Sequence, residues 1–517
     1  QPAGGPRRCN VAALQELARA GGPIQPHFSS PERHFDAARA LGRAWPVVRD
    51  ELQHHARGCY SALSRVKREN RQAEHALMAA ERWATLAFLL ADGADPRAAL
   101  EQAWQQVLFN QFHDILAGTC IREGYEAVWQ GYAQARQAAE TLQRRALGCL
   151  AGLLATPSGN GEAIAVWNPL PWARQEVVQF EIPLGDWRYD RRGQRYPQVI
   201  LCDAQGDAVP CQTLDVVFDQ NTYLARVAAF VPAPGLGAAL LRAQIQAGLH
   251  PSEPATPPEA STIENDLYRL SVDPATGWIS SLWDRERKAE LLAEPILRPL
   301  VMDDPSDTWS HDVAAFRQVC GSFMASEPPR LLHAGEVCQT LRVRSAWGES
   351  ALEQEITLYR NLPWVDITCT VDWHEQHKAL KMAFPFALQD AAVIASSPYG
   401  WVQRAAKGEE EPCQEWLAIQ GRGPDGPQGF CLLNDCKHGY DALEGELRLT
   451  ALRSPIYAFH APRGVIPGVR YHYTDQGLQS WRLRLIPYRR SWQEVRPIHA
   501  AYALHEPLVA LRMRPGT

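Results

Sequence analysis

The stretch Trp364–Trp373, WVDITCTVDW, decides the fold of the larger part of this chain. Apolar residues occupy every second position from Val365 to Trp373, and Asp or Thr occupies the positions between them. Alternation with a period of two predicts a strand with one buried face. Residues 178–182 alternate in the same way, and no helical pattern lies between the strands. We therefore expect large antiparallel β-sandwiches rather than a doubly wound parallel sheet.

The periodicity before this β region is helical, from about residue 40 to residue 154. Ser64–Leu90, SRVKRENRQAEHALMAAERWATLAFLL, is rich in good helix formers. A turn follows in which Asp95 can cap the next helix and Pro96 can begin it. Apolar residues between Leu100 and Phe112 recur every three or four positions, and a further helical pattern runs to about residue 154. Three long helices with short connections predict an antiparallel three-helix bundle.

These patterns predict a multidomain α+β protein, and 517 residues suffice for about three to four domains. Residues 1–45 resemble the tail of an α/β unit that is too small to bury a core. Residues 46–155 form the predicted bundle, residues 162–249 a small β-sandwich, and residues 262–517 a large β-sandwich with the C-terminal strands. The Pro-rich stretch His250–Ser261 is interpreted as the linker between the two sandwiches.

Composition excludes several functional classes. The chain is 46% hydrophobic and 21% charged, which is ordinary for a globular protein, and its net charge is −6. An acidic balance argues against a nucleic-acid partner and against an anionic membrane surface. No window holds the roughly 18–20 apolar residues that a membrane span needs. The 12 cysteines are scattered without metal-finger spacing, which favours buried thiols in a reducing compartment.

One candidate site residue pair stands where an apolar helix ends, in Asn110–Thr119, NQFHDILAGT. His113 and Asp114 could simply cap that helix end. The imidazole is also a suitable zinc ligand, and the adjacent carboxylate could bind sugar hydroxyls or orient the ring. A metal site needs three or four ligands, so the pair alone does not establish one.

Six segments spread along the chain carry further motifs. They are 51–81 at the start of the bundle, LFNQFHDILAGT (108–119), AVWNPLPWAR (165–174), IENDLYRLSVDPATGWISSLWDRE (263–286), LLNDCKHGYD (432–441) and LRSPIY (452–457). These segments resemble motifs of glycoside hydrolase family 38 α-mannosidases, in the order in which that family has them, and the resemblance covers about residues 28–488.

The resemblance implies a retaining α-mannosidase that holds one divalent metal ion, usually zinc, against the hydroxyls of the bound mannose. It also implies an N-terminal barrel-like α/β domain, of which residues 1–45 would be the remnant, and a large sandwich like that of galactose mutarotases. Carried over to this sequence, His113 would be a metal ligand from the helical domain, and Asp114 would bind sugar hydroxyls.

The resemblance also suggests further substrate-binding residues. Tyr60 aligns with a segment near the family's sugar site, although a core tyrosine with a satisfied hydroxyl would explain it equally well. Tyr440 could line the cleft from the β side or serve a strand turn. Asp307 and Trp309 have side chains suited to sugars, but their stretch departs from the family's commoner form.

No catalytic residue is assigned within this chain. Retaining hydrolysis needs two carboxyl groups about 5–5.5 Å apart, one as nucleophile and one as acid and then base. We expect both to lie upstream of Gln1, so that the intact enzyme hydrolyses terminal α-D-mannosyl residues and this chain alone does not. The expected partner is an α-mannoside oligosaccharide or glycan fragment. The expected location is the cytoplasm of a bacterium. A homo-oligomer is possible.

Two other functional classes remain open. The chain could be a non-catalytic carbohydrate-binding protein that kept the sandwiches, or an assembly scaffold. An upstream coding region with an HxD pair and a later Asp would favour the enzyme. Metal content also discriminates, because a binding module needs no metal and one ligand holds zinc only loosely.

Overall fold

The structure is a computed structural model. It describes residues 6–49, 51, 55–155, 160–184, 195–219, 222–251, 258–311, 313–423, 426–458 and 465–513. The chain divides into two compact units, Gln1–His55 and Ala56–Thr517.

The first unit contains two helices, α1 (Arg8–Arg19) and α2 (Pro31–Ala40). Ser30 caps α2, because its hydroxyl accepts a hydrogen bond from the Arg33 backbone N–H at 3.4 Å. Neither helix has a buried residue, as expected for a segment too short to build a core. No strand occurs among residues 6–49 that the structure describes, so the barrel remnant stays a prediction.

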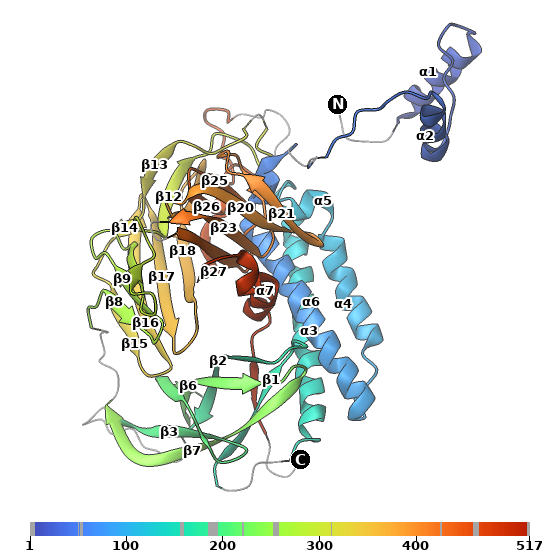
Figure 1. Cartoon of the computed structure of the whole chain (residues 1–517). Coiled ribbons are helices and arrows are strands. Elements are labelled where there is room, and N and C mark those ends of the chain that lie inside the picture. Colours follow the sequence, from blue (N-terminus) through green and yellow to red (C-terminus); the bar gives the residue numbers. More distant parts are fainter. Residues whose placement is uncertain are drawn as a thin grey trace. The chain divides into compact units, whose positions relative to one another are not determined.

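The second unit begins with the predicted bundle. The short helix η1 (Arg57–Tyr60) leads into α3 (Ser64–Leu90), α4 (Arg97–Asn110), α5 (His113–Leu116) and α6 (Gly124–Ala151). The long helices α3, α4 and α6 lie side by side along one flank of the strands (Figure 1). Their core contains small, aliphatic and aromatic side chains, among them Ala73, Leu77 and Tyr132. Asp95 accepts from the Arg97 backbone N–H at 3.0 Å, but α4 begins at Arg97 with Pro96 as its N-cap, one residue later than the sequence predicted.

The small β region consists of a five-stranded sheet, in the order β28-β1-β7-β3-β4, and a three-stranded sheet, in the order β2-β6-β5. Its strands are β1 (Glu162–Asn168), β2 (Arg174–Pro183), β3 (Arg195–Asp203), β4 (Ala208–Val209), β5 (Cys211–Asp219), β6 (Thr222–Ala233), β7 (Gly237–Pro251) and β28 (Val509–Arg512). The sequence grouped residues 509–512 with the large sandwich, but the structure pairs β28 with β1.

The large β region has a ten-stranded, a six-stranded and a four-stranded sheet around one apolar core. Its strands are β8 (Thr262–Glu264), β9 (Tyr268–Val272), β10 (Ile279–Asp284), β11 (Ala289–Glu290), β12 (Arg298–Asp303), β13 (Val319–Ser322), β14 (Met324–Ala325), β15 (Arg330–Ala334), β16 (Cys338–Trp347), β17 (Ser350–Tyr359), β18 (Val365–Trp373), β19 (Lys378–Pro385), β20 (Gln389–Ser397), β21 (Gly400–Ala405), β22 (Glu411–Pro412), β23 (Trp416–Gly423), β24 (Gly426–Asn434), β25 (Gly439–Leu443), β26 (Glu446–Arg453) and β27 (Gly477–Tyr488). Two more helices follow, η2 (Trp492–Val495) and α7 (Pro497–His505).

The alternation in β18 buries one face of the strand, as the sequence predicts. Val365, Ile367, Cys369, Val371 and Trp373 are all fully buried, and the polar residues between them are more exposed. Every strand pairing in the described part of the chain is antiparallel, which confirms the α+β class with β-sandwiches.

The predicted linker His250–Ser261 is shorter in the structure. Its first two residues, His250 and Pro251, belong to β7 and pair with β3. Glu259 forms a β-bridge with Arg330, and residues 252–257 lie outside the described residues. Among the described helices, none is both long and apolar enough to cross a membrane.

The bundle is held on the large sandwich by polar contacts at the start of α3. Asp475 accepts from the Ser64 backbone N–H at 2.9 Å, and Lys437 donates to the Ser64 hydroxyl at 2.5 Å. An amide at a helix start has no partner within its own helix, so the sandwich carboxylate satisfies it. At the other end of α3, the rings of Trp83 and Trp167 pack edge to face at 5.4 Å, which joins the bundle to β1.

Candidate functional site

A cleft of about 930 Å³ lies between the bundle and the large sandwich. The bundle contributes Tyr60, Asn70, Arg71, Glu74, Gln111 and His113, among others, and the sandwich side contributes residues 396–400 and 412–416, His438, Ile498 and Tyr502. Amide, charged and aromatic side chains thus share one concave wall. Such a mixture suits a ligand with many hydroxyl groups and an apolar face.

The α5 turn, residues 111–118, carries His113 at the edge of this cleft. Gln111 fixes its start by donating to Asn70 and Glu74 of α3, at 3.0 and 2.8 Å. Gly118 fixes its end, because its φ is +81° and a Cβ there would lie 2.3 Å from the Ala62 carbonyl oxygen. The chain therefore needs glycine where the helical pattern breaks.

His113 and Asp114 point largely into solvent. Their side chains are 80% and 50% exposed, and His113 Nε2 lies 3.6 Å from Asp114 Oδ1. A buried core role for this imidazole is thereby excluded. His113 lines the cleft, whereas Asp114 does not. The pair is available to a ligand or to another domain.

Tyr60 lines the same cleft from η1. Burial, with the nearby Glu411 carboxylate, raises the pKa of its phenol to about 12. The hydroxyl is consequently protonated at neutral pH and can donate or accept hydrogen bonds. The structure thus brings Tyr60 and His113 to one cavity, and their roles in sugar binding stay predictions.

Asp307 and Trp309 lie beside η1 but do not line the cleft. The Trp309 carbonyl accepts from the Gly58 backbone N–H at 3.1 Å, and the Asp307 carboxylate accepts from His311 Nδ1 at 2.7 Å. Both residues hold the loop that supports η1. Their predicted contact with substrate is untested.

This loop is organised by Arg453, a fully buried residue. Its guanidinium donates to both oxygens of Asp304, at 2.9 and 3.1 Å, to the Ser306 hydroxyl at 2.7 Å and to the Gly58 carbonyl at 3.0 Å. We refer to Arg453, Asp304, Ser306 and Gly58 as the Arg453 network. The network fixes η1, and so the position of Tyr60.

Tyr440 is only 1% exposed, in β25, and is absent from the cleft wall. Its hydroxyl accepts from Arg404 at 3.3 Å. Burial raises the pKa of this phenol as well. A side chain enclosed in this way supports the strand, and we leave Tyr440 out of the site proposed below.

The described cleft wall contains two carboxylates, Glu74 and Glu415, and Arg71 contacts both, at 3.2 and 3.3 Å. Burial alone would raise the pKa of Glu415, but His75 and Arg71 outweigh it and lower that pKa. A general acid for glycoside hydrolysis needs a raised pKa, so Glu415 is unsuited to that role.

Metal binding was predicted at His113, and the structure tests the donor set. Apart from the adjacent Asp114, no nitrogen, sulfur or carboxylate group completes a ligand set with His113 among the described residues. A metal at His113 would therefore need donors from elsewhere. The described residues do bring together another donor group, His75, Glu415 and His505.

Sequence reasoning missed this second group and most of the cleft wall. His75 lies in α3, Glu415 before β23 and His505 at the end of α7. No spacing rule links residues so far apart. The available signal was the helical register, since Asn70 and Glu74, and likewise Arg71 and His75, are four positions apart and so lie one turn from each other on α3.

Comparisons with known proteins agree with the resemblance in the sequence. Residues 54–150 match the alpha mannosidase middle domain, and residues 263–462 match the C-terminal domain of glycosyl hydrolases family 38. These two segments correspond to the helical bundle and to most of the large sandwich.

Curated relatives extend the match over nearly the whole chain. The chain is 27% identical to mouse Alpha-mannosidase 2C1, over 98% of this chain and 45% of that protein. It is 22% identical to Alpha-mannosidase G of Dictyostelium discoideum, over 97% of this chain and 47% of that protein. The chain thus spans about half the length of these relatives.

A solved structure supports the fold. An alpha-mannosidase from Enterococcus faecalis superimposes with a TM-score of 0.76 at 14% identity, over 98% of this chain and 64% of that one. At this identity the likeness shows a shared fold.

Proposed function

We propose that this chain, which carries an alpha mannosidase middle domain and the C-terminal domain of glycosyl hydrolase family 38, forms part of a retaining α-mannosidase. The intact enzyme would hydrolyse terminal α-D-mannosyl residues of an oligosaccharide or glycan fragment. The observation that carries the proposal is the match to alpha-mannosidases along 98% of the chain, with His113 exposed at a polar cleft.

The surface around His113 supports a further domain in contact with it. Leu108, Phe109 and Phe112 are 60%, 80% and 55% exposed, directly before the imidazole. Contiguous exposed aromatic side chains commonly mark an interface. We propose that the catalytic domain of the intact protein covers these side chains and supplies both catalytic carboxyl groups.

Within that assembly His113, Asp114 and Tyr60 act on the sugar side. His113 would hold a divalent metal ion, zinc by family resemblance, together with donors from the catalytic domain. Such an ion would polarise the hydroxyls of the bound mannose. Asp114 would accept hydrogen bonds from sugar hydroxyls, and the protonated Tyr60 phenol would donate one.

The experiment compares the full-length gene product with its His113→Gln variant, using an α-D-mannoside with a chromogenic leaving group. We expect wild-type turnover and a loss of roughly 100-fold or more in kcat/KM for the variant, as for a metal ligand. His472→Gln, at an exposed residue that contacts Arg122, is the matched control and should keep activity. A full-length protein without mannosidase activity would overturn the proposal.

The same experiment addresses the two other classes. The 517-residue chain alone should show no sustained turnover. If the full-length protein bound mannosides without hydrolysing them, a carbohydrate-binding role would replace the enzyme.

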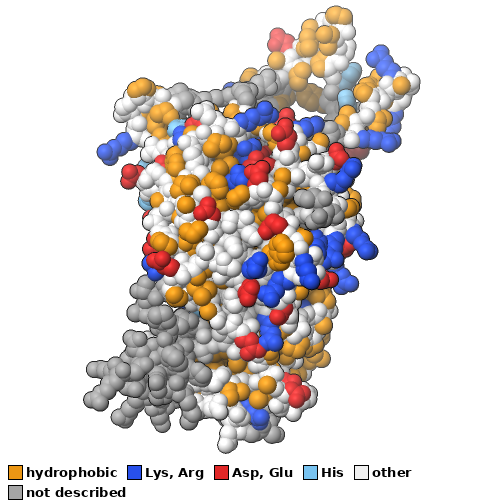
Figure 2. Space-filling model, turned by 60° about the vertical axis from the view of Figure 1, so that its left-hand side comes forward, with side chains coloured by type: hydrophobic (Ala, Val, Ile, Leu, Met, Phe, Trp, Pro, Cys, Tyr) orange, Lys and Arg blue, Asp and Glu red, His pale blue; other side chains and the backbone are white. Residues whose placement is uncertain are grey.

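We also propose a reducing compartment, the cytoplasm, for this protein. All 12 cysteines are free thiols, and five of them are buried. Basic, acidic and apolar side chains are mingled over the face drawn in Figure 2.

A further inference from the structure

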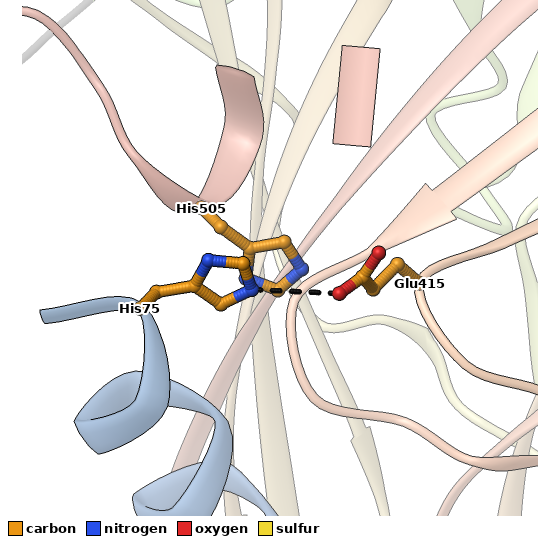
Figure 3. A group of neighbouring side chains, drawn as sticks. All are labelled: His75, Glu415 and His505. Carbon is orange, nitrogen blue, oxygen red and sulfur yellow. Dashed lines mark ion pairs between the residues drawn. The ribbon is translucent and has the colours of Figure 1, made fainter. Parts of the chain in front are cut away.

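Three side chains from distant segments meet beside the cleft. His75 projects from α3, His505 from the end of α7 and Glu415 from the loop before β23 (Figure 3). The two imidazole rings stack in parallel, with centroids 4.1 Å apart and an interplanar angle of 7°. Potential ligand atoms of all three residues lie within 4.8 Å of one another.

Two nitrogens in this group lack hydrogen-bond partners. His75 Nε2 and His505 Nε2 are buried and form no hydrogen bond, although His75 Nε2 lies 3.4 Å from Glu415 Oε1 as an ion pair. A buried polar atom without a partner costs free energy comparable to a lost hydrogen bond, so such atoms call for an explanation. Here both atoms belong to the same cluster, and both are of the kind that binds metals.

The second nitrogen of His75 orients the ring for coordination. Nδ1 lies 3.1 Å from Glu506 Oε1, and Glu506 is held in turn by Arg82. Burial lowers the pKa of His75, but its interactions with Glu415 and Glu506 outweigh burial and raise that pKa, so an ion would have to displace the Nε2 proton while Nδ1–H keeps its bond to Glu506. Histidines that bind zinc commonly have such a carboxylate behind them.

The spacing also fits a tetrahedral ion. Ligand atoms about 2.0–2.1 Å from zinc lie roughly 3.3–3.4 Å from one another in a tetrahedron. His75 Nε2 is 3.4 Å from Glu415 Oε1, so this pair already has that separation. The His505 ring is stacked in parallel on His75, so it would have to turn out of the stack for its Nε2 to point at the same ion. Arg71 contacts Glu415 Oε1 at 3.3 Å, but the carboxylate has a second oxygen to offer a cation.

From this geometry we propose that His75, Glu415 and His505 form a zinc site distinct from the one predicted at His113. Two imidazole nitrogens and one carboxylate oxygen would hold the ion, and the fourth position would face the cleft that Glu415 lines. The site shares no residue with the proposed mannoside site and does not rest on the proposed function.

The zinc would join three parts of the chain. α3 belongs to the bundle, the loop before β23 to the large sandwich, and α7 lies near the C-terminus. One ion bound to all three would restrain the bundle against the sandwich, close to the cleft wall. Its role would be structural, because binding to a site formed only in the fold stabilises that fold.

The test measures zinc binding to the purified 517-residue chain after chelation and dialysis. We expect about one zinc per chain that raises Tm, and visible d–d bands of tetrahedral Co²⁺ when cobalt replaces zinc. His505→Gln and Glu415→Gln should weaken zinc binding roughly tenfold or more and remove the Tm increase. Circular dichroism of each metal-free variant checks that it has folded.

Two control variants separate this site from others. His113→Gln should keep the zinc and its Tm increase, and so should His499→Gln, a histidine of α7 whose ring stacks on Trp172. The inference would be overturned by a folded wild-type chain that binds no zinc. Zinc that survives both His505→Gln and Glu415→Gln, or that is lost in His113→Gln, would equally overturn it.

Discussion

The Arg453 network and the α5 turn hold the same short segment, residues 57–63, at two points, Gly58 and Ala62. In the network, the guanidinium is 0% exposed and bonds to Asp304, Ser306 and the Gly58 carbonyl. In the α5 turn, Gly118 packs on Ala62 while His113 extends into solvent, 80% exposed. Both are short polar motifs in the sequence. The buried Arg453 network therefore supports the site, whereas the exposed His113 of the α5 turn is free to bind.

The largest effect on stability should follow from breaking the buried Arg453 network. Arg453→Met leaves the Asp304 carboxylate buried without its cation, which costs about 3–5 kcal/mol of unfolding free energy. Chemical denaturation measures this. Arg422→Met is the control, since Arg422 and Asp390 are 70% and 79% exposed, and such pairs contribute about 0–1 kcal/mol. Equal losses of unfolding free energy in Arg453→Met and Arg422→Met would contradict the difference between the buried and the exposed ion pair.

A smaller effect on stability should follow from changing the α5 turn. Gly118→Ala forces a Cβ toward the Ala62 carbonyl at positive φ, and we expect a loss of about 1–3 kcal/mol. Gly148→Ala, inside α6 with open space around it, should instead stabilise by about 0.5–1 kcal/mol. The two Tm values should move in opposite directions. A neutral Gly118→Ala would show that the turn can adjust.

The comparison extends to two histidines of the cleft wall, exposed His113 and enclosed His438. Burial, with repulsion from Arg71, Lys67 and Lys437, lowers the pKa of His438 from 6.5 to about 3. Between these values the unfolded chain takes up a proton that the fold excludes, so stability falls as pH drops below about 6.5.

The variant His438→Gln isolates this contribution. From pH 7 to pH 5, wild type should lose up to about 2 kcal/mol more unfolding free energy than the variant, since one proton contributes about 1.4 kcal/mol per pH unit. Denaturant titrations at both pH values measure the difference. Parallel losses would mean that His438 protonates in the folded protein.

The smallest effect on stability should come from His113→Gln. An exposed side chain without a buried partner contributes within about 0.5 kcal/mol, so the free energy of unfolding should stay nearly unchanged. A loss above about 1 kcal/mol would place His113 among the supporting residues and remove the reason for assigning it to binding.

Much of the fold could be predicted from local pattern. The helix Ser64–Leu90 has the predicted bounds, and the alternation in Val365–Trp373 buries the predicted face. Both depend on the short-range periodicity of side chains, which is written in the sequence. The linker after residue 249 was less predictable, because β3 pairing rather than composition carries β7 through Pro251.

The sequence by itself determined the helical bundle, the antiparallel sandwiches and the motif that contains His113. Only the tertiary structure decided that Tyr440 is enclosed, that Tyr60 and His113 share a cleft, and that His75, Glu415 and His505 meet. The physical reason is the sequence separation over which each kind of interaction acts. Periodicity and turn chemistry act over a few residues, whereas these contacts join segments from tens to hundreds of positions apart, through packing that no local pattern encodes.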